Sequence, residues 1–161
     1  MKVYKALLLL ISAAVMPSVG PAQTPELNHV FYICARISGS IDGETRDGIM
    51  ERKIPITGGE IKGVVSGTIL PGGADFQLVD EANKRTRLRA VYEVMTPDSV
   101  VIKVVNEGIN TYGPDGYYFV TSPRFECDRN SPYGWLNDRI FVCRPVDFGD
   151  GVITLRVWEA K

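Results

Sequence analysis

The sequence predicts an all-β protein, a single antiparallel closed or nearly closed β-barrel of about eight to ten strands. Short runs of aromatic and β-branched residues recur at regular spacing along the 161 residues, and turns rich in glycine or proline separate them. No segment of useful length has the apolar period of a helix. Closure of the sheet suits the glycine-marked bends and removes exposed strand edges.

The first 22 residues have the layout of a secretory signal peptide. Lys2 and Lys5 form a basic start, an apolar run covers 6–16, and Gly20-Pro21-Ala22 offers small residues for cleavage. A membrane span needs about 20 apolar residues, and this run is much shorter. We therefore expect residues 1–22 to be removed, residues 23–161 to form one barrel domain, and the protein to be secreted or periplasmic.

Charge and composition narrow the classes of partner. The chain has 18 basic and 19 acidic residues, and loss of Lys2 and Lys5 changes the net charge from −1 to −3. No basic stripe indicates nucleic acid, and no amphipathic basic segment indicates a membrane surface once the signal is cleaved. His29 is the single histidine, which excludes a multi-histidine metal site. We expect no metal, no cofactor, a small-molecule ligand or substrate, and a possible homo-oligomer.

Three cysteines, Cys34, Cys127 and Cys143, would meet an oxidising compartment after export. One pair could form a disulfide, or all three could be buried thiols. The odd count favours buried thiols, but spacing does not decide between the two.

The first half of the barrel domain begins with a run rich in aromatic and β-branched residues. It is expected to contain strands at 29–37, 52–56 and 60–70, with a loop at 38–48 and a turn at 57–59. Pro55 confines the second of these strands to an edge or an end of the sheet.

The second half has one strand whose side chains alternate almost strictly, over 86–94. The alternation predicts that Arg87, Arg89 and Glu93 face outward and that Leu88, Ala90, Tyr92 and Val94 face inward. Further strands are expected at 76–79, 99–105, 117–121, 124–127, 140–143 and 152–159, with a glycine-rich loop at 106–116.

The stretch 70–78 contains a glycine pair, Gly72-Gly73, followed by an acid and an amide. Glycine pairs in a strand pattern mark a bend or a close backbone approach. Asp75 and Gln77 are two residues apart, so an extended chain places them on one face. Either Asp75 satisfies backbone donors at the turn, or both side chains point into the barrel and bind or protonate a ligand. In the second case burial raises the pKa of the carboxyl toward the range of acid–base catalysis.

Other candidates also have two interpretations. Tyr92 is a core tyrosine with a backbone partner, or a ligand contact and proton donor. Arg124 and Glu126 are an exposed charge pair, or Arg124 is a lumen-facing cation that holds a carboxylate or phenolate while Glu126 orients it or acts as a base. Trp135 and Asn137 follow a loop and could line the rim of the barrel. Trp135 either plugs the barrel end or offers a stacking surface to a flat ligand. The predicted catalytic residues are Asp75, Tyr92, Arg124 and Glu126, and the predicted ligand-binding residues are Gly73, Gln77, Trp135 and Asn137.

Six blocks of sequence together resemble the family catalogued as domain of unknown function 3237. They are 54–59, 70–77, 90–92, 118–126, 133–137 and 157–159. The resemblance extends from about Val30 to Glu159, and it departs at Phe76, where the family often has tryptophan, and in the leader. It implies a calycin-like antiparallel barrel, as in lipocalins, and carries no agreed activity.

Because one fold supports many functions, the function must come from the site. We expect a cofactor-independent enzyme that uses acid–base chemistry, of isomerase, cyclase or lyase type, on a small aromatic or polyketide-like molecule in the lumen. A non-catalytic small-molecule-binding barrel is the alternative, and a structural barrel with a filled lumen is the third. The enzyme hypothesis predicts that the four catalytic candidates converge on one pocket, with Gln77 nearby and Trp135 at the rim.

Overall fold

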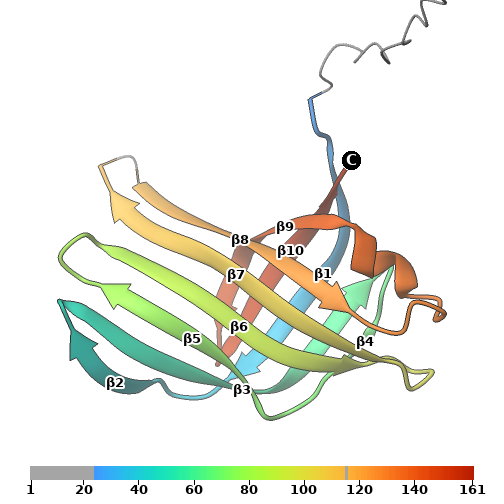
Figure 1. The fold of residues 1–161 in the computed structure, drawn as a ribbon, viewed down its shortest axis with the longest axis horizontal. Helices are drawn as coiled ribbons and strands as arrows, with labels where there is room; N and C mark the ends of the chain where they lie inside the picture. Colours follow the sequence, from blue (N-terminus) through green and yellow to red (C-terminus); the bar gives the residue numbers. More distant parts are fainter. Residues whose placement is uncertain (1–23, 115) are drawn as a thin grey trace, which may run out of the picture.

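A computed structural model describes residues 24–114 and 116–161. The predicted signal peptide lies outside these residues. Within them the chain forms ten antiparallel strands and one short 3-10 helix, arranged as a barrel (Figure 1). The elements are β1 Leu27–Ile37, β2 Ile41–Arg46, β3 Ile49–Gly63, β4 Gly67–Ile69, β5 Gly73–Asp80, β6 Arg85–Met95, β7 Val101–Gly113, β8 Gly116–Glu126, η1 Gly134–Asp138, β9 Ile140–Gly149 and β10 Val152–Ala160.

The sheet closes because β1 pairs with both β10 and β3. From β10 the order continues through β9, β8, β7 and β6, and the short strands β4 and β5 share one position between β6 and β3. β2 pairs with β3 beyond the end of β1. The predicted all-β closed barrel is therefore confirmed.

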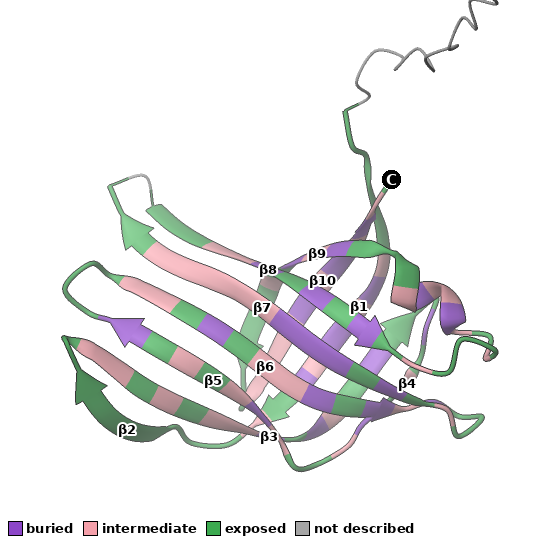
Figure 2. Cartoon of the chain, in the orientation of Figure 1, coloured by how far each residue is buried: buried purple, intermediate pink, exposed green. Residues whose placement is uncertain are grey.

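The alternation along β6 sets the two faces of the barrel wall as the sequence predicted. Leu88, Tyr92 and Val94 are buried, whereas Arg87 and Glu93 are exposed. Figure 2 shows this alternation of buried and exposed residues along the front strands. Because successive side chains of a strand point to opposite faces, only one set of alternate residues in β6 can face the core.

Strands are longer than the turn signals suggest. β3 runs through Gly58 and Gly59, where a turn was expected, and β7 and β8 pair as far as Gly113 opposite Gly116, where a loop was expected. A Cβ atom on Gly59 would lie 2.1 Å from the Cys34 carbonyl oxygen, so glycine lets β3 pass close to β1. Pairing with a neighbouring strand overrides local turn propensity in these segments.

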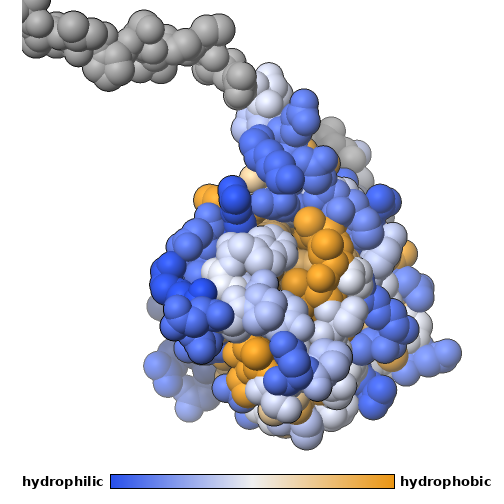
Figure 3. Space-filling model, turned by 90° about the vertical axis from the view of Figure 1, so that its right-hand side faces the viewer, coloured by the Kyte–Doolittle hydropathy of each residue, from blue (hydrophilic) through white to orange (hydrophobic). Residues whose placement is uncertain are grey.

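Side chains fill one end of the barrel. Phe31 and Phe125 pack edge to face with ring centroids 5.6 Å apart, Phe125 and Phe141 pack likewise at 5.0 Å, and η1 adds the buried Leu136. Buried residues concentrate in the half of the barrel next to η1 and β4 (Figure 2). Viewed from that side, the surface is mostly hydrophilic with limited apolar areas (Figure 3). This half is the closed end of the barrel.

All three cysteines are free thiols, with Cys143 buried and Cys34 and Cys127 partly buried. In residues 24–114 and 116–161, no helix has the length and apolar character needed to cross a membrane.

Candidate functional site

The barrel lumen keeps a small cavity of about 60 Å³ between the closed end and the opposite mouth. Four polar side chains, on β5, β6, β7 and β8, line this cavity. Two further side chains form hydrogen bonds with them. We call these six residues the lumen cluster: Asp75, Tyr92, Asn106 and Thr121 on the cavity wall, with Gln77 and Cys143 as their partners. The rest of the lining is mainly aliphatic, with Phe119 as the single further aromatic. The cluster is therefore a polar spot in an apolar lumen, the usual form of a small-molecule site.

Asp75 and Gln77 lie on one face of β5, as their spacing predicts, and Asp75 lines the lumen cavity. Gln77 Nε2 donates a hydrogen bond of 2.7 Å to Asp75 Oδ2. Asp75 Oδ1 is buried and has no hydrogen-bond partner among the described residues. Burial raises the pKa of the Asp75 carboxyl, and the hydrogen bond from Gln77 only partly opposes that rise.

Tyr92 lies diagonally across from Asp75, because Asp75 pairs with Ala90 on β6 and Tyr92 is two residues further along. Diagonal neighbours on one face of a sheet are within reach of aromatic side chains. The Tyr92 hydroxyl is buried and, like Asp75 Oδ1, has no partner within residues 24–114 and 116–161. Burial, and to a lesser degree the nearby Cys143, raise the pKa of Tyr92. The phenol is therefore a proton-bearing donor at every physiological pH.

Gly73 makes room for Tyr92. A Cβ atom at Gly73 would lie 2.5 Å from Tyr92 Cβ, closer than real side chains approach. We predict that Gly73→Ala lowers the free energy of unfolding by about 1–3 kcal/mol, because overpacking displaces Tyr92 or β5. Gly39→Ala is the matched control, since a Cβ there would meet nothing within 4 Å. Urea unfolding measures both, and equal costs for the two variants would contradict the close approach.

Cys143 completes the cluster from β9. Its Sγ lies 2.7 Å from Thr121 Oγ1 and accepts a longer bond of 3.6 Å from Asn106 Nδ2. Burial raises the pKa of the thiol, while the Thr121 and Asn106 bonds act in the opposite direction. Cys143 is therefore held as an unreactive thiol in the native fold.

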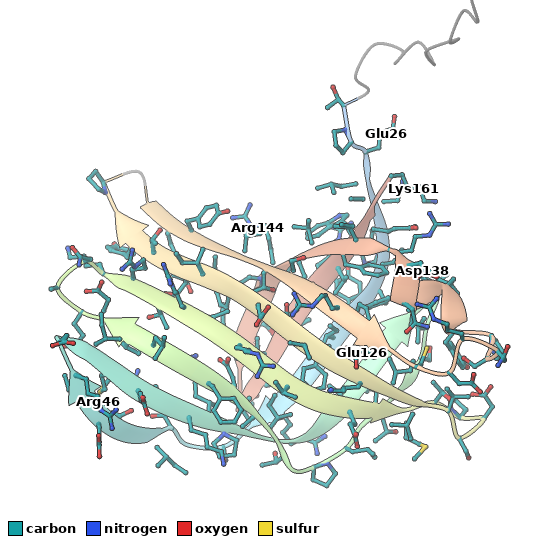
Figure 4. The ribbon with its side chains drawn as sticks, viewed as in Figure 1. Glu26, Arg46, Glu126, Asp138, Arg144 and Lys161 are labelled. Carbon is teal, nitrogen blue, oxygen red and sulfur yellow. The ribbon has the colours of Figure 1, made fainter. Side chains whose placement is uncertain are left out.

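Arg124 and Glu126 do not join the cluster, so the prediction that they face the lumen is wrong. Their side chains are 66% and 69% exposed. Arg124 Nη2 donates to Glu107 Oε2 at 2.9 Å, and Glu126 Oε2 lies 3.5 Å from Lys103 Nζ. Phe125 between them is buried at the closed end, and alternation then forces both charges outward. Figure 4 shows Glu126 near the C-terminal end of β8.

Trp135 and Asn137 lie in η1 at the closed end, and neither lines the lumen cavity. The Trp135 ring packs against Phe141 with centroids 6.1 Å apart. Asn137 Oδ1 accepts from the Cys127 backbone N–H at 3.0 Å, and Asn137 Nδ2 donates to the Gly134 carbonyl at 2.9 Å. Trp135 therefore fits the plug interpretation, whereas Asn137 binds the backbone at Cys127, directly after β8.

Sequence reasoning missed Asn106 and Thr121 as site residues. Asn106 falls in the segment expected to be a loop, and Thr121 ends the first of two strands expected where β8 is continuous. In the continuous strands β7 and β8, Asn106 lies on the same inward face as Val104, and Thr121 lies on the same inward face as Phe125. A polar side chain at such a buried position indicates a site residue.

A second cavity, of about 780 Å³, is a groove on the outer face of β3, β5, β6 and β7. The exposed Phe76 and Leu78 form part of its floor, and charged side chains including Arg87 and Arg89 flank them. None of the buried unpartnered polar atoms found in the described residues belongs to this groove. In the same residues, no group of three or more His, Cys, Asp and Glu side chains could hold a metal ion. We therefore place the candidate site in the lumen.

Curated relatives cover most of the chain. A UPF0311 protein of Bradyrhizobium diazoefficiens is 38% identical over 147 residues, which span 81% of this chain and 95% of the relative. A UPF0311 protein of Rhodopseudomonas palustris is 38% identical over 146 residues, with 81% and 94% covered.

Solved structures share the barrel. A conserved protein of unknown function from Rhodopseudomonas palustris is 35% identical, with a TM-score of 0.77 over 87% of this chain and 100% of the other. A β-barrel-like protein from Acinetobacter baumannii is 25% identical, with a TM-score of 0.79 over 88% and 99%. An enzyme from Penicillium herquei is 22% identical, with a TM-score of 0.71 over 89% and 100%, which shows a common fold.

The family model described as a protein of unknown function, DUF3237, matches residues 25–160. This match covers nearly all of the described barrel, and the curated relatives agree with it. The chain belongs to the DUF3237 family.

Proposed function

We propose that the protein is a cofactor-independent enzyme that carries out acid–base chemistry on a small oxygen-containing molecule bound in the lumen. One observation carries the proposal: Asp75 Oδ1 and Tyr92 Oη are both buried, both unpartnered in the part of the chain that the structure describes, and neighbours on one cavity wall. A buried polar group without a partner costs about 1–3 kcal/mol. A ligand that bonds to both groups would remove that cost.

The two groups suit a carbonyl or hydroxyl compound. Tyr92 donates to the ligand oxygen, where negative charge develops when a neighbouring C–H proton leaves. Asp75 takes that proton as a carboxylate, or gives one as a carboxylic acid and takes it back in a later step. The raised pKa of Asp75 brings the carboxyl closer to the working pH, where a general acid or base is most effective. Isomerisation, cyclisation and elimination all use such proton transfers.

The size of the lumen limits what enters it. Pockets for drug-sized ligands measure roughly 300–1,000 Å³, and this cavity measures about 60 Å³. Only the reacting part of a larger molecule fits beside Asp75. At the mouth, Phe119 packs against both Tyr117 and Phe148. These rings offer flat apolar surface to the rest of the molecule, which supports an aromatic or conjugated substrate. The Penicillium herquei enzyme supports only the point that this barrel fold can carry catalysis.

Proton exchange tests the proposal without a known substrate. Ketones of increasing size, from acetone and cyclopentanone to 2-tetralone, are incubated with the protein in D₂O, and deuterium at the carbon next to the carbonyl is followed by NMR. The proposal expects exchange above the buffer rate with the wild type, and exchange that is slower by about 10²–10⁴-fold with Asp75→Asn. Binding of the same ketones without any exchange would overturn the enzyme hypothesis. It would favour the non-catalytic binding barrel, because Asp75 and Tyr92 can also bind a ligand by hydrogen bonds without proton transfer.

We further propose, from the leader, that the enzyme acts outside the cytoplasm as a secreted or periplasmic protein. The intact mass of exported protein decides this, since a mass that includes Lys2 and Lys5 would refute cleavage.

A further inference from the structure

Among the strand pairs of residues 24–114 and 116–161, the pair with the shortest ladder is β8 and β9. β7 and β8 pair along their whole lengths, from Lys103 opposite Glu126 to Gly113 opposite Gly116. β8 and β9 share a single ladder pair, Thr121 opposite Cys143. We call this join the β8–β9 seam.

Two prolines explain why the seam is short. Pro123 follows Thr121 by two residues on β8, and Pro145 follows Cys143 by two residues on β9, so the prolines flank the single pair on opposite sides. Proline has no N–H with which to extend a ladder. On the side of the closed end, the Ser122 hydroxyl donates to the Phe141 carbonyl at 2.8 Å and replaces a missing backbone bond.

On the mouth side, aromatic contact replaces the ladder. Phe119 of β8 and Phe148 of β9 stack with ring centroids 6.2 Å apart and planes inclined by 26°. Phe119 also lines the lumen cavity, and Phe148 is 55% exposed. An aromatic pair contributes about 0.5–1.5 kcal/mol beyond the area it buries. We call these two residues the mouth pair.

We propose that the β8–β9 seam is the entrance to the lumen and that the mouth pair selects ligands by their cross-section. The inference rests on the proposed function, because it takes the lumen cluster as the binding site. Extended ladders join β3, β5, β6, β7 and β8, and opening any of them would break backbone hydrogen bonds. Aromatic side chains plug the opposite end. Separation of the mouth pair would open the wall beside the lumen cluster at a much smaller cost in free energy than breaking the backbone hydrogen bonds of a ladder.

Cys143 reports opening of the seam. It is fully buried and forms the single ladder pair of the seam with Thr121. The full chain is treated with N-ethylmaleimide across low urea concentrations, and labelling of the peptide that contains Cys143 is followed by mass spectrometry. Local opening gives a rate that depends little on urea, whereas global unfolding gives the full denaturant slope of the protein.

Two variants sharpen the test. Phe148→Ala is expected to raise the Cys143 labelling rate by about 2- to 12-fold, the range that corresponds to loss of one aromatic pair. Phe76→Ala is the matched control, because Phe76 has a similar exposure of 48% but lies on the outer face of β5. The Phe76 variant should leave the rate unchanged. In the D₂O assay, Phe148→Ala should raise exchange into 2-tetralone relative to cyclopentanone.

Labelling of Cys143 with the full urea slope, or equal rates in the two variants, would show that the seam is not the entrance. If Phe148→Ala leaves the ratio of the exchange rates of 2-tetralone and cyclopentanone unchanged, the mouth pair does not select ligands. Neither result is evidence against the proposed acid–base function. That function fails only if no exchange occurs or if exchange does not need Asp75.

Discussion

Asp75→Asn is expected to slow proton transfer in the lumen strongly while the barrel stays folded. Asparagine keeps the shape of the side chain, and its oxygen can still accept the hydrogen bond that Gln77 Nε2 donates to Asp75 Oδ2. It cannot take up or release a proton at neutral pH. General acid–base groups contribute about 10²–10⁴-fold to rate, so turnover should fall by that factor in the NMR exchange assay.

The same variant has an expected stability signature. The folded pKa of Asp75 is raised above its ordinary value of 3.8, so the native state binds more protons than the unfolded state as the pH rises above that value. Stability therefore falls as the pH rises from the unfolded pKa through the folded pKa, and the penalty is fully present above both. Asp75→Asn should be more stable than the wild type at neutral pH, and this gain should vanish in acid.

Asp98 provides a control of opposite sign. Hydrogen bonds from Thr96 and Tyr133 lower the pKa of its carboxyl. Asp98→Asn should thus lose stability at neutral pH relative to acid, with exchange activity intact. Urea unfolding of both variants across pH measures the difference. An Asp75→Asn variant that is destabilised at neutral pH and keeps its activity would show that Asp75 only holds the turn before β5.

Phe31→Ala should have the largest effect on stability, a loss of about 3–5 kcal/mol in the free energy of unfolding. Phe31 is 0% exposed and contacts both Phe125 and Phe141 in the closed end. Truncation removes the transfer free energy of the ring and leaves a cavity among rigid strands that cannot collapse to fill it. Urea unfolding again gives the value.

The exposed Phe76 serves as the control for this variant too, and its truncation should cost less than about 1 kcal/mol. A similarly small cost for Phe31→Ala would mean that the aromatic plug does not hold the barrel end together. The closed end would then offer a second way into the lumen, which would remove one of the arguments for access through the β8–β9 seam.

Periodicity explains both the success and the failure of sequence reasoning at this site. Strict alternation along β6 identified Tyr92 as inward, and the two-residue spacing paired Asp75 with Gln77. The same rule applied to 124–126 would have placed the apolar Phe125 inside and both charges outside. The resemblance to a family block favours a functional role for Arg124 and Glu126, whereas their local pattern indicates an outer face.

Long-range pairing accounts for what the sequence could not reveal. Asn106 looked like the start of a glycine-rich loop, and only its ladder with β8 makes it a strand residue that faces the lumen. The contact between Thr121 and Cys143 joins two strands across the seam. No local pattern in 117–121 or 140–143 encodes that register.

Crystal structures of the protein soaked with cyclopentanone and acetone test the central claim most directly, because they show where a small carbonyl compound binds. The account predicts a ketone in the lumen cavity, with its oxygen within hydrogen-bond distance of Tyr92 Oη and its neighbouring carbon beside Asp75 Oδ1. Ketones that bind only in the outer groove around Phe76 and Leu78, with the lumen closed by its own side chains, would contradict it.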